Sequence, residues 1–257
     1  MPKLLVERRG PATVLTIDRP EVHNCIDGET AVGIARAVTG FTDDPDARVL
    51  VVTGAGTASF SSGADLKHAH ELWAHGSFHE AGPLGFARLD PGKPTIAAVN
   101  GYCFAGGMEL AAWCDFRVAA ANAEFGVLNR RWGVPFVDGG TQHLTKIVGL
   151  GNALYLIESG VRIDARAARE IGFVQEIVPE GHALPRALEL AERIAEYPQA
   201  SLRADRRASR ASFGLPLGEG LLFEREHGMV TLGEPEMAEA LERFATGDRP
   251  EPPRPPP

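Results

Sequence analysis

The chain has 257 residues, of which 44% are hydrophobic and 23% charged, a composition typical of globular proteins and unlike that of disordered chains. This length suits one large domain or two small ones and is sufficient to bury a sizeable core. The formal net charge of −8 argues against nucleic acid as a partner, while a local basic pocket for a small phosphorylated ligand remains compatible with it.

The first half of the chain predicts strands that alternate with helices. A hairpin is expected over residues 3–9 and 12–18, and a helix with apolar residues at the 3.6-residue period starts at Asp27 or Gly28. Continuous apolar runs, typical of buried parallel strands, follow at 48–53, 94–99 and 115–119. This alternation indicates βαβ units and therefore the α/β class.

From about Gly140 the pattern becomes helical. Helices are expected at 141–157, 164–171, 184–196 and 199–211 and within 217–246, with one short strand at 174–178. We therefore expect three parts along the chain. They are an α/β core over residues 1–195, a C-terminal helical region over 196–247, and a proline-rich tail over 248–257 that we expect to be disordered.

Several common signatures do not occur in the sequence. The stretch 54–59 breaks the GxGxxG pattern at its last position, and neither a P-loop nor a GxSxG elbow is found. No CxxC or HExxH motif supports a metal site, and the three cysteines form no disulfide framework. We recognise no signal peptide and no apolar stretch of about 18 residues, so we expect a cytoplasmic protein that does not span a membrane.

Two glycine-rich segments, 54–66 and 100–110, each follow a predicted buried strand directly. Small residues leave the backbone bare there, and open α/β sheets bind ligands at such carboxyl ends of strands. Bare N–H groups at the start of a helix favour negative charge, so two converging loops can supply two donors to one developing oxyanion. For either loop alone, a tight turn that uses glycine for positive φ is the simpler interpretation.

Taken in chain order, the two loops and their flanks resemble the crotonase superfamily, the enoyl-CoA hydratase/isomerase group. The matching pieces are Asp18-Arg19-Pro20-Glu21 with Asn24, then 60–66, 93–101, 106–110 with Cys114-Asp115, Phe125-Gly126, and 139–144. The resemblance covers roughly residues 3–247. It implies a crotonase-like spiral of ββα units and a C-terminal helical region that assembles a homotrimer or hexamer. It also implies an acyl-CoA thioester as substrate, with coenzyme A as part of that substrate and no separate cofactor.

The resemblance further implies roles for residues at matching positions. The N–H groups of Ala64 and Gly106 correspond to the two oxyanion donors, and carbonyls near Ser62 and Ala64 correspond to those that meet the adenine of CoA. The remaining expected substrate or CoA contacts are His23, Asp65, Leu66, Asn129 and Trp132.

Glu109 matches the first of the two carboxylates of hydratases in this family. It follows Gly106 by about one helical turn, where a glutamate can act as general acid or base and partial burial brings its pKa toward the working pH. A glutamate that merely suits the helix dipole is the structural alternative.

The second hydratase carboxylate is missing, because its position is occupied by Asn129. An amide can orient water but cannot carry a proton back and forth. Asp138 is a candidate replacement, since dienoyl-CoA isomerases and naphthoate synthases of this superfamily carry an aspartate in a similar loop. The alternative for Asp138 is a turn or N-cap residue of the helix that begins near Gly140.

Three functions therefore remain open at this point. The first is an enoyl-CoA hydratase, a lyase, that uses Glu109 for proton transfer. The second is an enoyl- or dienoyl-CoA double-bond isomerase that uses Glu109 with Asp138. The third belongs to another class: a protein that binds acyl-CoA without turning it over.

Two further clusters of charged or titratable side chains need an interpretation. The histidines at 68, 70, 75 and 79 predict a mobile lid rather than a metal site. The arginines at 203, 206, 207 and 210 recur at helical spacing and predict a solvated helix face, with a contact to the CoA diphosphate as the alternative.

Overall fold

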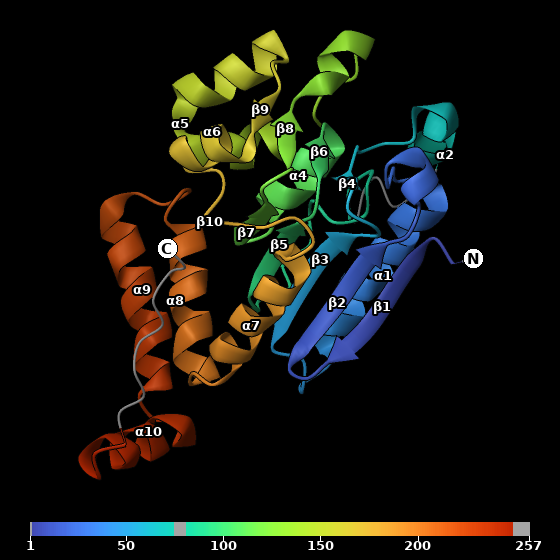
Figure 1. The fold of residues 1–257 in the computed structure, drawn as a ribbon. Helices are drawn as coiled ribbons and strands as arrows, with labels where there is room; N and C mark the ends of the chain where they lie inside the picture. Colours follow the sequence, from blue (N-terminus) through green and yellow to red (C-terminus); the bar gives the residue numbers. More distant parts are fainter. Residues whose placement is uncertain (1, 75–80, 249–257) are drawn as a thin grey trace.

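The computed structural model describes residues 2–74 and 81–248 of the chain. Its main layer is a six-stranded sheet in the order β1-β2-β3-β5-β7-β10 (Figure 1). These strands are β1 (Leu4–Arg9), β2 (Ala12–Ile17), β3 (Val49–Gly54), β5 (Thr95–Val99), β7 (Phe116–Ala120) and β10 (Glu176–Val178). Only β1 pairs antiparallel, with β2, and every other pairing in this sheet is parallel. The α/β class is therefore confirmed.

Both faces of this sheet are covered, as the continuous apolar strands predict. All six residues of β3 are buried. The helix α7 (Ala183–Ala195) covers one face and packs there through Ala183, Ala187 and Ala191, whose four-residue spacing places them on one side of the helix. The other face packs against α1 (Gly28–Asp43) and α4 (Gly106–Trp113), which share the larger apolar core.

The start and end of α1 follow from its sequence. Asp27 is the N-cap, and its side chain accepts a 2.9 Å hydrogen bond from the N–H of Thr30. The buried positions of the helix include Ile34, Val38 and Phe41, as the apolar period predicts. The helix ends at Asp43, before Pro45.

A second sheet was not predicted by the local sequence patterns, although the ββα units implied by the resemblance include a second strand. It has the order β4-β6-β8-β9, with the strands β4 (Ser59–Ser61), β6 (Tyr102–Phe104), β8 (Glu124–Gly126) and β9 (Ile163–Asp164). Strands of two or three residues are too short for a periodic pattern, and β4 and β6 lie inside the two segments expected to be loops. This sheet therefore holds both glycine-rich segments in register.

The remaining elements are mostly helical. They are η1 (Pro20–Val22), η2 (Leu66–His68), α2 (Ala69–Ala74), η3 (Leu128–Trp132), α5 (Gly140–Ser159), α6 (Ala165–Glu170), α8 (Gln199–Ala211), α9 (Leu217–Thr231) and α10 (Pro235–Ala245). In Figure 1, α9 and α10 extend away from the sheets. Among the described residues, no helix combines the length and apolar character needed to cross a bilayer.

The arginine-rich helix α8 differs from its expected role as a solvated face. Arg206 forms ion pairs of 2.8 Å with Asp115 and 2.9 Å with Asp90, and its side chain is only 10% exposed. Arg210 adds a 2.9 Å pair with Asp115. These two arginines therefore tie α8 to the α/β core, and only Arg207 of the four is exposed to solvent.

Candidate active site

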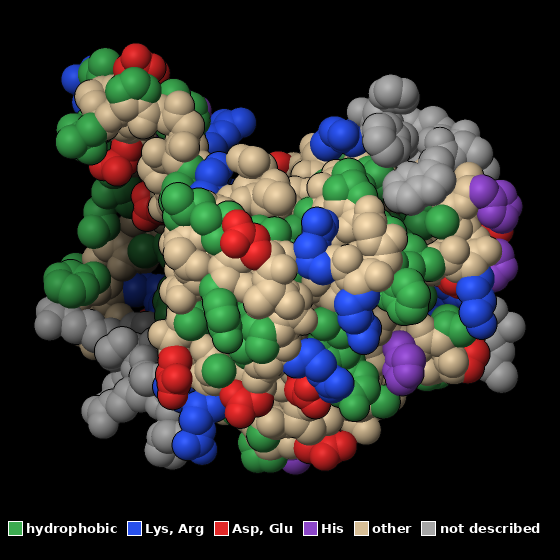
Figure 2. All heavy atoms as spheres, turned by 90° about the horizontal axis from the view of Figure 1, so that it is seen from above, with side chains coloured by type: hydrophobic (Ala, Val, Ile, Leu, Met, Phe, Trp, Pro, Cys, Tyr) green, Lys and Arg blue, Asp and Glu red, His purple; other side chains and the backbone are tan. Residues whose placement is uncertain are grey.

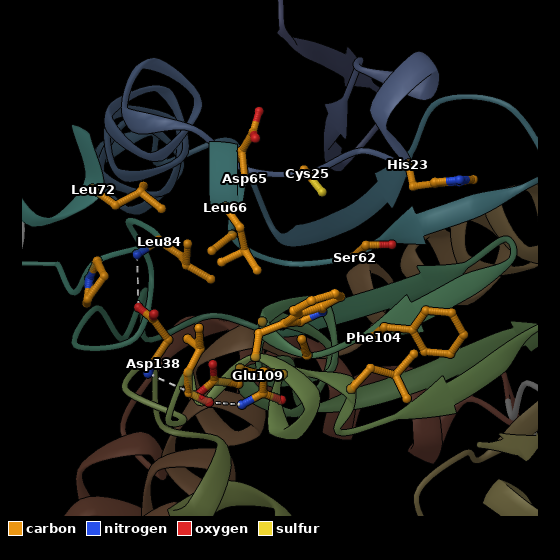
Figure 3. A pocket seen from close by; sticks show the side chains of 18 of the residues that line it. His23, Cys25, Ser62, Asp65, Leu66, Leu72, Leu84, Phe104, Glu109 and Asp138 are labelled. Atoms are coloured by element: carbon orange, nitrogen blue, oxygen red, sulfur yellow. Dashed lines mark hydrogen bonds between the residues drawn. The ribbon is translucent and has the colours of Figure 1, made fainter. Parts of the chain in front are cut away.

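A cavity of about 470 Å³ opens where the two glycine-rich segments meet η3 and the loop before α5 (Figure 3). Every residue of the site expected from the sequence lines it: His23, Ser62, Ala64, Asp65, Leu66, Gly106, Glu109, Asn129, Trp132 and Asp138. The fold thus brings together positions that are more than 100 residues apart in the chain.

The two glycine-rich segments touch at Gly63-Ala64 and Gly106. A Cβ atom on Gly63 would lie 2.4 Å from the Gly106 nitrogen, and one on Gly106 would lie 3.5 Å from the Ala64 nitrogen. Gly106 is the first residue of α4, so its N–H has no acceptor within the helix. The N–H of Ile26 donates a 2.8 Å hydrogen bond to the carbonyl oxygen of Gly63, and the N–H of Asp65 donates one of 2.8 Å to the carbonyl oxygen of Ile26. Because backbone groups alternate in direction along an extended segment, the N–H of Ala64 points away from Ile26. The backbone nitrogens of Ala64 and Gly106 therefore lie near each other at the edge of the cavity.

The turn into α4 is strained, and the structure shows what holds it. Ala105 has φ of 50° without being glycine, which costs roughly 1–3 kcal/mol. Its N–H donates a 2.9 Å hydrogen bond to the carbonyl oxygen of Gly126 in β8, and its carbonyl accepts from Met108 and Glu109. The second sheet therefore fixes the backbone that presents Gly106 to the cavity.

Glu109 is buried, with 3% of its surface exposed, and it lines the cavity. Its Oε1 accepts hydrogen bonds of 2.9 Å from the N–H groups of Asp138 and Gly140. Burial, and secondly the charge of Asp138, raise the pKa of Glu109 to about 8. Gly140 is required for this contact, because a Cβ atom there would lie 2.7 Å from Cγ of Glu109.

Asp138 is 1% exposed, and burial raises its pKa to about 6. It does not cap α5: the N-cap is Gly139, which has φ of 89°, and no side chain caps this helix. The Oδ1 atom of Asp138 instead accepts a 3.0 Å hydrogen bond from the N–H of Leu84. Figure 3 shows the Asp138 side chain between Leu84 and the part of the cavity that holds Glu109. Two carboxyl groups of raised pKa therefore share one cavity.

Of the other expected contacts, Asp65 forms ion pairs within the protein. Its carboxylate pairs with Arg19 at 2.9 Å and with His68 at 3.1 Å, and in Figure 3 it points away from Glu109. Arg19 and Asp65 thereby brace the loop that carries Ala64. Asp65 borders the cavity, but its charge is already paired.

The remaining expected contacts lie at the rim or in the wall of the cavity. His23 is exposed, as are Leu66 at 44% and Trp132 at 68%. The N–H of Ser62 donates a 3.1 Å hydrogen bond to the carbonyl of His23, which joins two of these positions. Asn129 is buried and donates a 2.7 Å hydrogen bond to the carbonyl of Val134. Seen from above, the molecule shows Lys and Arg side chains interspersed with hydrophobic ones (Figure 2).

The sequence did not single out the apolar part of the cavity wall, which includes Leu72, Leu84, Phe104, Leu128, Val134, Pro135 and Val137. Their only signal in the sequence is hydrophobicity, which core residues share.

Of the expected histidine lid, His68 pairs with Asp65, while His75 and His79 lie outside the described residues. No group of three or more His, Cys, Asp or Glu side chains within 2–74 and 81–248 is arranged to hold a metal ion.

Comparison with known proteins identifies the relatives of this chain. Residues 7–250 match the sequence profile of the enoyl-CoA hydratase/isomerase family. A curated relative, carnitinyl-CoA dehydratase from Salmonella agona, is 37% identical over 226 residues, which cover 86% of this chain and 85% of the relative. Solved structures of enoyl-CoA hydratases from Mycobacterium marinum and Mycobacterium tuberculosis superpose with TM-scores of 0.91, at 30% and 31% identity, and cover 98% of both chains.

Proposed function

Since the chain belongs to the enoyl-CoA hydratase/isomerase family, we propose that it catalyses reversible hydration of an enoyl-CoA through a thioester enolate. The observation that carries this proposal is the close approach of the backbone at Gly63-Ala64 to Gly106, beside the buried carboxyl group of Glu109. The Salmonella relative is named a dehydratase of a CoA ester, which supports the same chemistry in the direction of water loss.

In this proposal, the thioester oxygen lies between the N–H groups of Ala64 and Gly106. Negative charge develops on that oxygen as the enolate forms, and two fixed donors stabilise it more than they stabilise the neutral thioester. The N-terminus of α4 adds its positive dipole end at the same place, because Gly106 is the first residue of that helix.

Glu109 is the proposed proton-transfer residue. Hydration joins the oxygen of water to Cβ and a proton to Cα of the acyl group. With its pKa near 8, Glu109 is ionised in a minor fraction of molecules at pH 7, and in this form it takes a proton from the water that attacks Cβ; the carboxylic acid so formed then delivers that proton to Cα of the enolate. In dehydration the carboxylate removes the Cα proton and returns it to the departing oxygen. Asn129 cannot share this work, since an amide is neither an acid nor a base at these pH values.

A second candidate function, double-bond isomerisation, is favoured by Asp138. With pKa values of about 8 and about 6, Glu109 and Asp138 hold one proton between them at pH 7. A base and an acid are then both present: one carboxylate removes a proton from Cα of a 3-enoyl-CoA, and one carboxylic acid delivers a proton at Cγ. This reaction consumes no water and leaves the total number of protons unchanged.

The CoA moiety is proposed to leave the cavity along the rim formed by His23, Ser62, Leu66 and Trp132. Assembly into a homotrimer or hexamer is proposed through the C-terminal region, where α9 and α10 expose large apolar side chains, among them Leu221, Val230 and Leu241.

A panel of enoyl-CoA and 3-hydroxyacyl-CoA esters incubated in deuterated water and followed by mass spectrometry tests the proposal. Hydration appears as the mass of added water, and isomerisation as deuterium in the acyl chain of an isomer without added water. Binding of acyl-CoA in calorimetry with neither product would favour the non-catalytic alternative and overturn both enzymatic candidates.

A further inference from the structure

Ser61 lies where the two glycine-rich segments meet, and 0% of its surface is exposed. It is the last residue of β4 and pairs with Cys103 of β6 in the second sheet. Its backbone lies directly against Gly107, the second residue of α4, because a Cβ atom on that glycine would overlap the carbonyl oxygen of Ser61. Ser61 therefore joins the end of β4 to the first turn of α4.

The hydroxyl group of Ser61 bridges two backbone groups from different parts of the chain. Its Oγ atom donates a 2.8 Å hydrogen bond to the carbonyl oxygen of Asn24 and accepts one of 3.1 Å from the N–H of Gly63. Because the carbonyl of Asn24 can only accept, the hydroxyl proton must point toward it, which leaves a lone pair of Oγ for Gly63. Neither Asn24 nor Gly63 belongs to a helix or a strand, so this side chain supports backbone that no regular element holds.

The conformation of Gly63 decides where the N–H of Ala64 points. The carbonyl oxygen of Gly63 accepts the hydrogen bond from Ile26, and across a trans peptide the C=O of one residue and the N–H of the next point in opposite directions. Gly63 also has φ of 81°, a conformation that glycine adopts without strain but does not enforce. Two hydrogen bonds thus hold the peptide groups on either side of Gly63, and Ser61 supplies the one that comes from a side chain.

We propose that Ser61 is a positioning residue of the oxyanion site: its hydroxyl group holds the Gly63-Ala64 backbone so that the N–H groups of Ala64 and Gly106 reach the same thioester oxygen. This inference rests on the proposed function, because it assumes that these two groups stabilise an enolate. Ser61 acts through Gly63 alone, since it has no exposed surface and is not part of the cavity wall.

Removal of the hydroxyl group should weaken enolate stabilisation without weakening the binding of CoA. A hydrogen bond loses strength steeply when the donor is misaligned, so a small rotation of the peptide before Ala64 is enough to reduce its effect on the oxyanion. In Ser61→Ala both contacts of Oγ are lost, and Gly63, which has no side chain, gains the freedom to make that rotation.

The test uses acetoacetyl-CoA, a β-keto thioester that ionises to an enolate and has no carbon–carbon double bond to hydrate. Ultraviolet absorbance at a fixed pH gives the ratio of enolate to keto form of the bound ligand. We expect the wild-type protein to raise this ratio above that of free acetoacetyl-CoA, and Ser61→Ala to lower it roughly 10-fold, the effect of weakening one hydrogen bond to a charged oxygen. The affinity for S-butyl-CoA, a thioether without a carbonyl to ionise, should stay unchanged in calorimetry.

Ser59→Ala is the matched control. Ser59 lies two residues earlier in β4 and is 2% exposed, and its Oγ atom bonds to the carbonyl oxygens of His23 and Tyr102 at 3.0 and 3.1 Å. The same substitution therefore removes a buried hydroxyl group but no contact to Gly63, and it should keep the wild-type ratio. Ser61→Cys retains a weaker acceptor at the same place and should give an intermediate ratio, which keeps the test open if Ser61→Ala does not fold.

The outcomes separate this inference from the proposed function. A wild-type ratio in every Ser61 variant that folds, or an equal decrease in Ser59→Ala, would overturn the role of Ser61 while the acyl-CoA site stands. If the wild-type protein binds acetoacetyl-CoA without raising the ratio above that of the free ligand, or does not bind it, the proposed enolate stabilisation is overturned as well.

Discussion

The backbone N–H of Asp138 donates a 2.9 Å hydrogen bond to Oε1 of Glu109. Its side chain acts on Glu109 in the opposite sense, because the negative charge of Asp138 helps burial to raise the pKa of Glu109 to about 8. One residue thus fixes the position of the Glu109 carboxyl group and also helps set its ionisation. The first three predictions follow from this pair.

Glu109→Gln should abolish proton transfer and leave binding intact. The glutamine keeps an oxygen that can accept from Asp138 and Gly140, but it has no titratable proton. We expect kcat to fall about 100- to 10,000-fold, the usual contribution of a general acid–base group, with little change in acyl-CoA affinity by calorimetry. Glu180→Gln, at an exposed position, is the control. Full turnover by Glu109→Gln would remove Glu109 from the mechanism.

The same variant should change how stability depends on pH. The pKa of Glu109 rises from an ordinary 4.5 to about 8 on folding, so between these values the unfolded chain has lost a proton that the folded chain keeps. Stability therefore falls as pH rises through this window, by up to a few kcal/mol, and below pH 4.5 the penalty is absent. Urea unfolding at pH 5 and pH 8 should show that Glu109→Gln gains stability over wild type at pH 8. A pH-independent difference would contradict the raised pKa.

Asp138→Asn should separate the two candidate reactions. The amide can still accept the hydrogen bond from the Leu84 N–H, while the negative charge near Glu109 is lost. The pH at which Glu109 ionises should therefore fall below about 8, visible in the pH profile of kcat/KM. If Asp138 carries a proton, isomerisation should drop about 100-fold or more while hydration persists. Unchanged isomerisation would retire Asp138 as an acid or base.

Gly106→Ala should impair the oxyanion donors and leave the fold intact. The added Cβ would lie 2.4 Å from Cδ1 of Leu84, a movable side-chain end, 3.1 Å from Cα of Gly63 and 3.5 Å from the Ala64 nitrogen, so that the two loops must separate by a few tenths of an ångström. A methyl group between the donors and the thioester oxygen should lower kcat/KM about 100- to 1,000-fold. Gly218→Ala, in α9 where a Cβ would meet nothing within 4 Å, is the matched control and should keep full activity. Normal activity of Gly106→Ala would exclude the proposed donor pair.

Arg206→Met should loosen the C-terminal helices from the core. Its loss leaves Asp90 and Asp115 with Arg210 as their remaining partner in this network, and we expect a loss of about 1–3 kcal/mol in unfolding free energy. Arg207→Met, on the exposed side of the same helix, should cost little. Chemical denaturation of both variants at matched concentration measures the difference, and equal stability would show that the ion pairs of Arg206 do not anchor α8.

Local signals predicted much of the fold. Asp27 caps α1 as its position before an apolar helical period indicates, and the apolar run of β3 is buried throughout. The second sheet escaped prediction because its strands have two or three residues, fewer than one full cycle of any pattern that separates strand from loop. The prediction that Arg206 lies on a solvated helix face was wrong for a different reason. Its partners Asp90 and Asp115 lie about a hundred residues earlier in the chain, and the spacing of arginines along one helix contains no information about such distant partners.

The residues of the candidate site that belong to a sequence motif could be predicted. Ala64, Gly106 and Glu109 stand in segments whose residue order resembles a family, and all three line the cavity. The role of Asp138 could not be read from its own neighbourhood, since Asp-Gly-Gly also suits a helix start. Its true partner, the N–H of Leu84, lies 54 positions away and becomes visible only in the folded chain.

The hydrogen bond from Leu84 to Asp138 has a consequence for protein engineering. Leu84 lines the cavity and lies against Gly106, so it is an obvious position at which to reshape the pocket for longer or branched substrates. Its N–H, however, helps to hold the pKa of Asp138 down against the effect of burial. Redesign that shifts this backbone would therefore retune the acidity of the site, and substrate range and pH optimum would have to be optimised together.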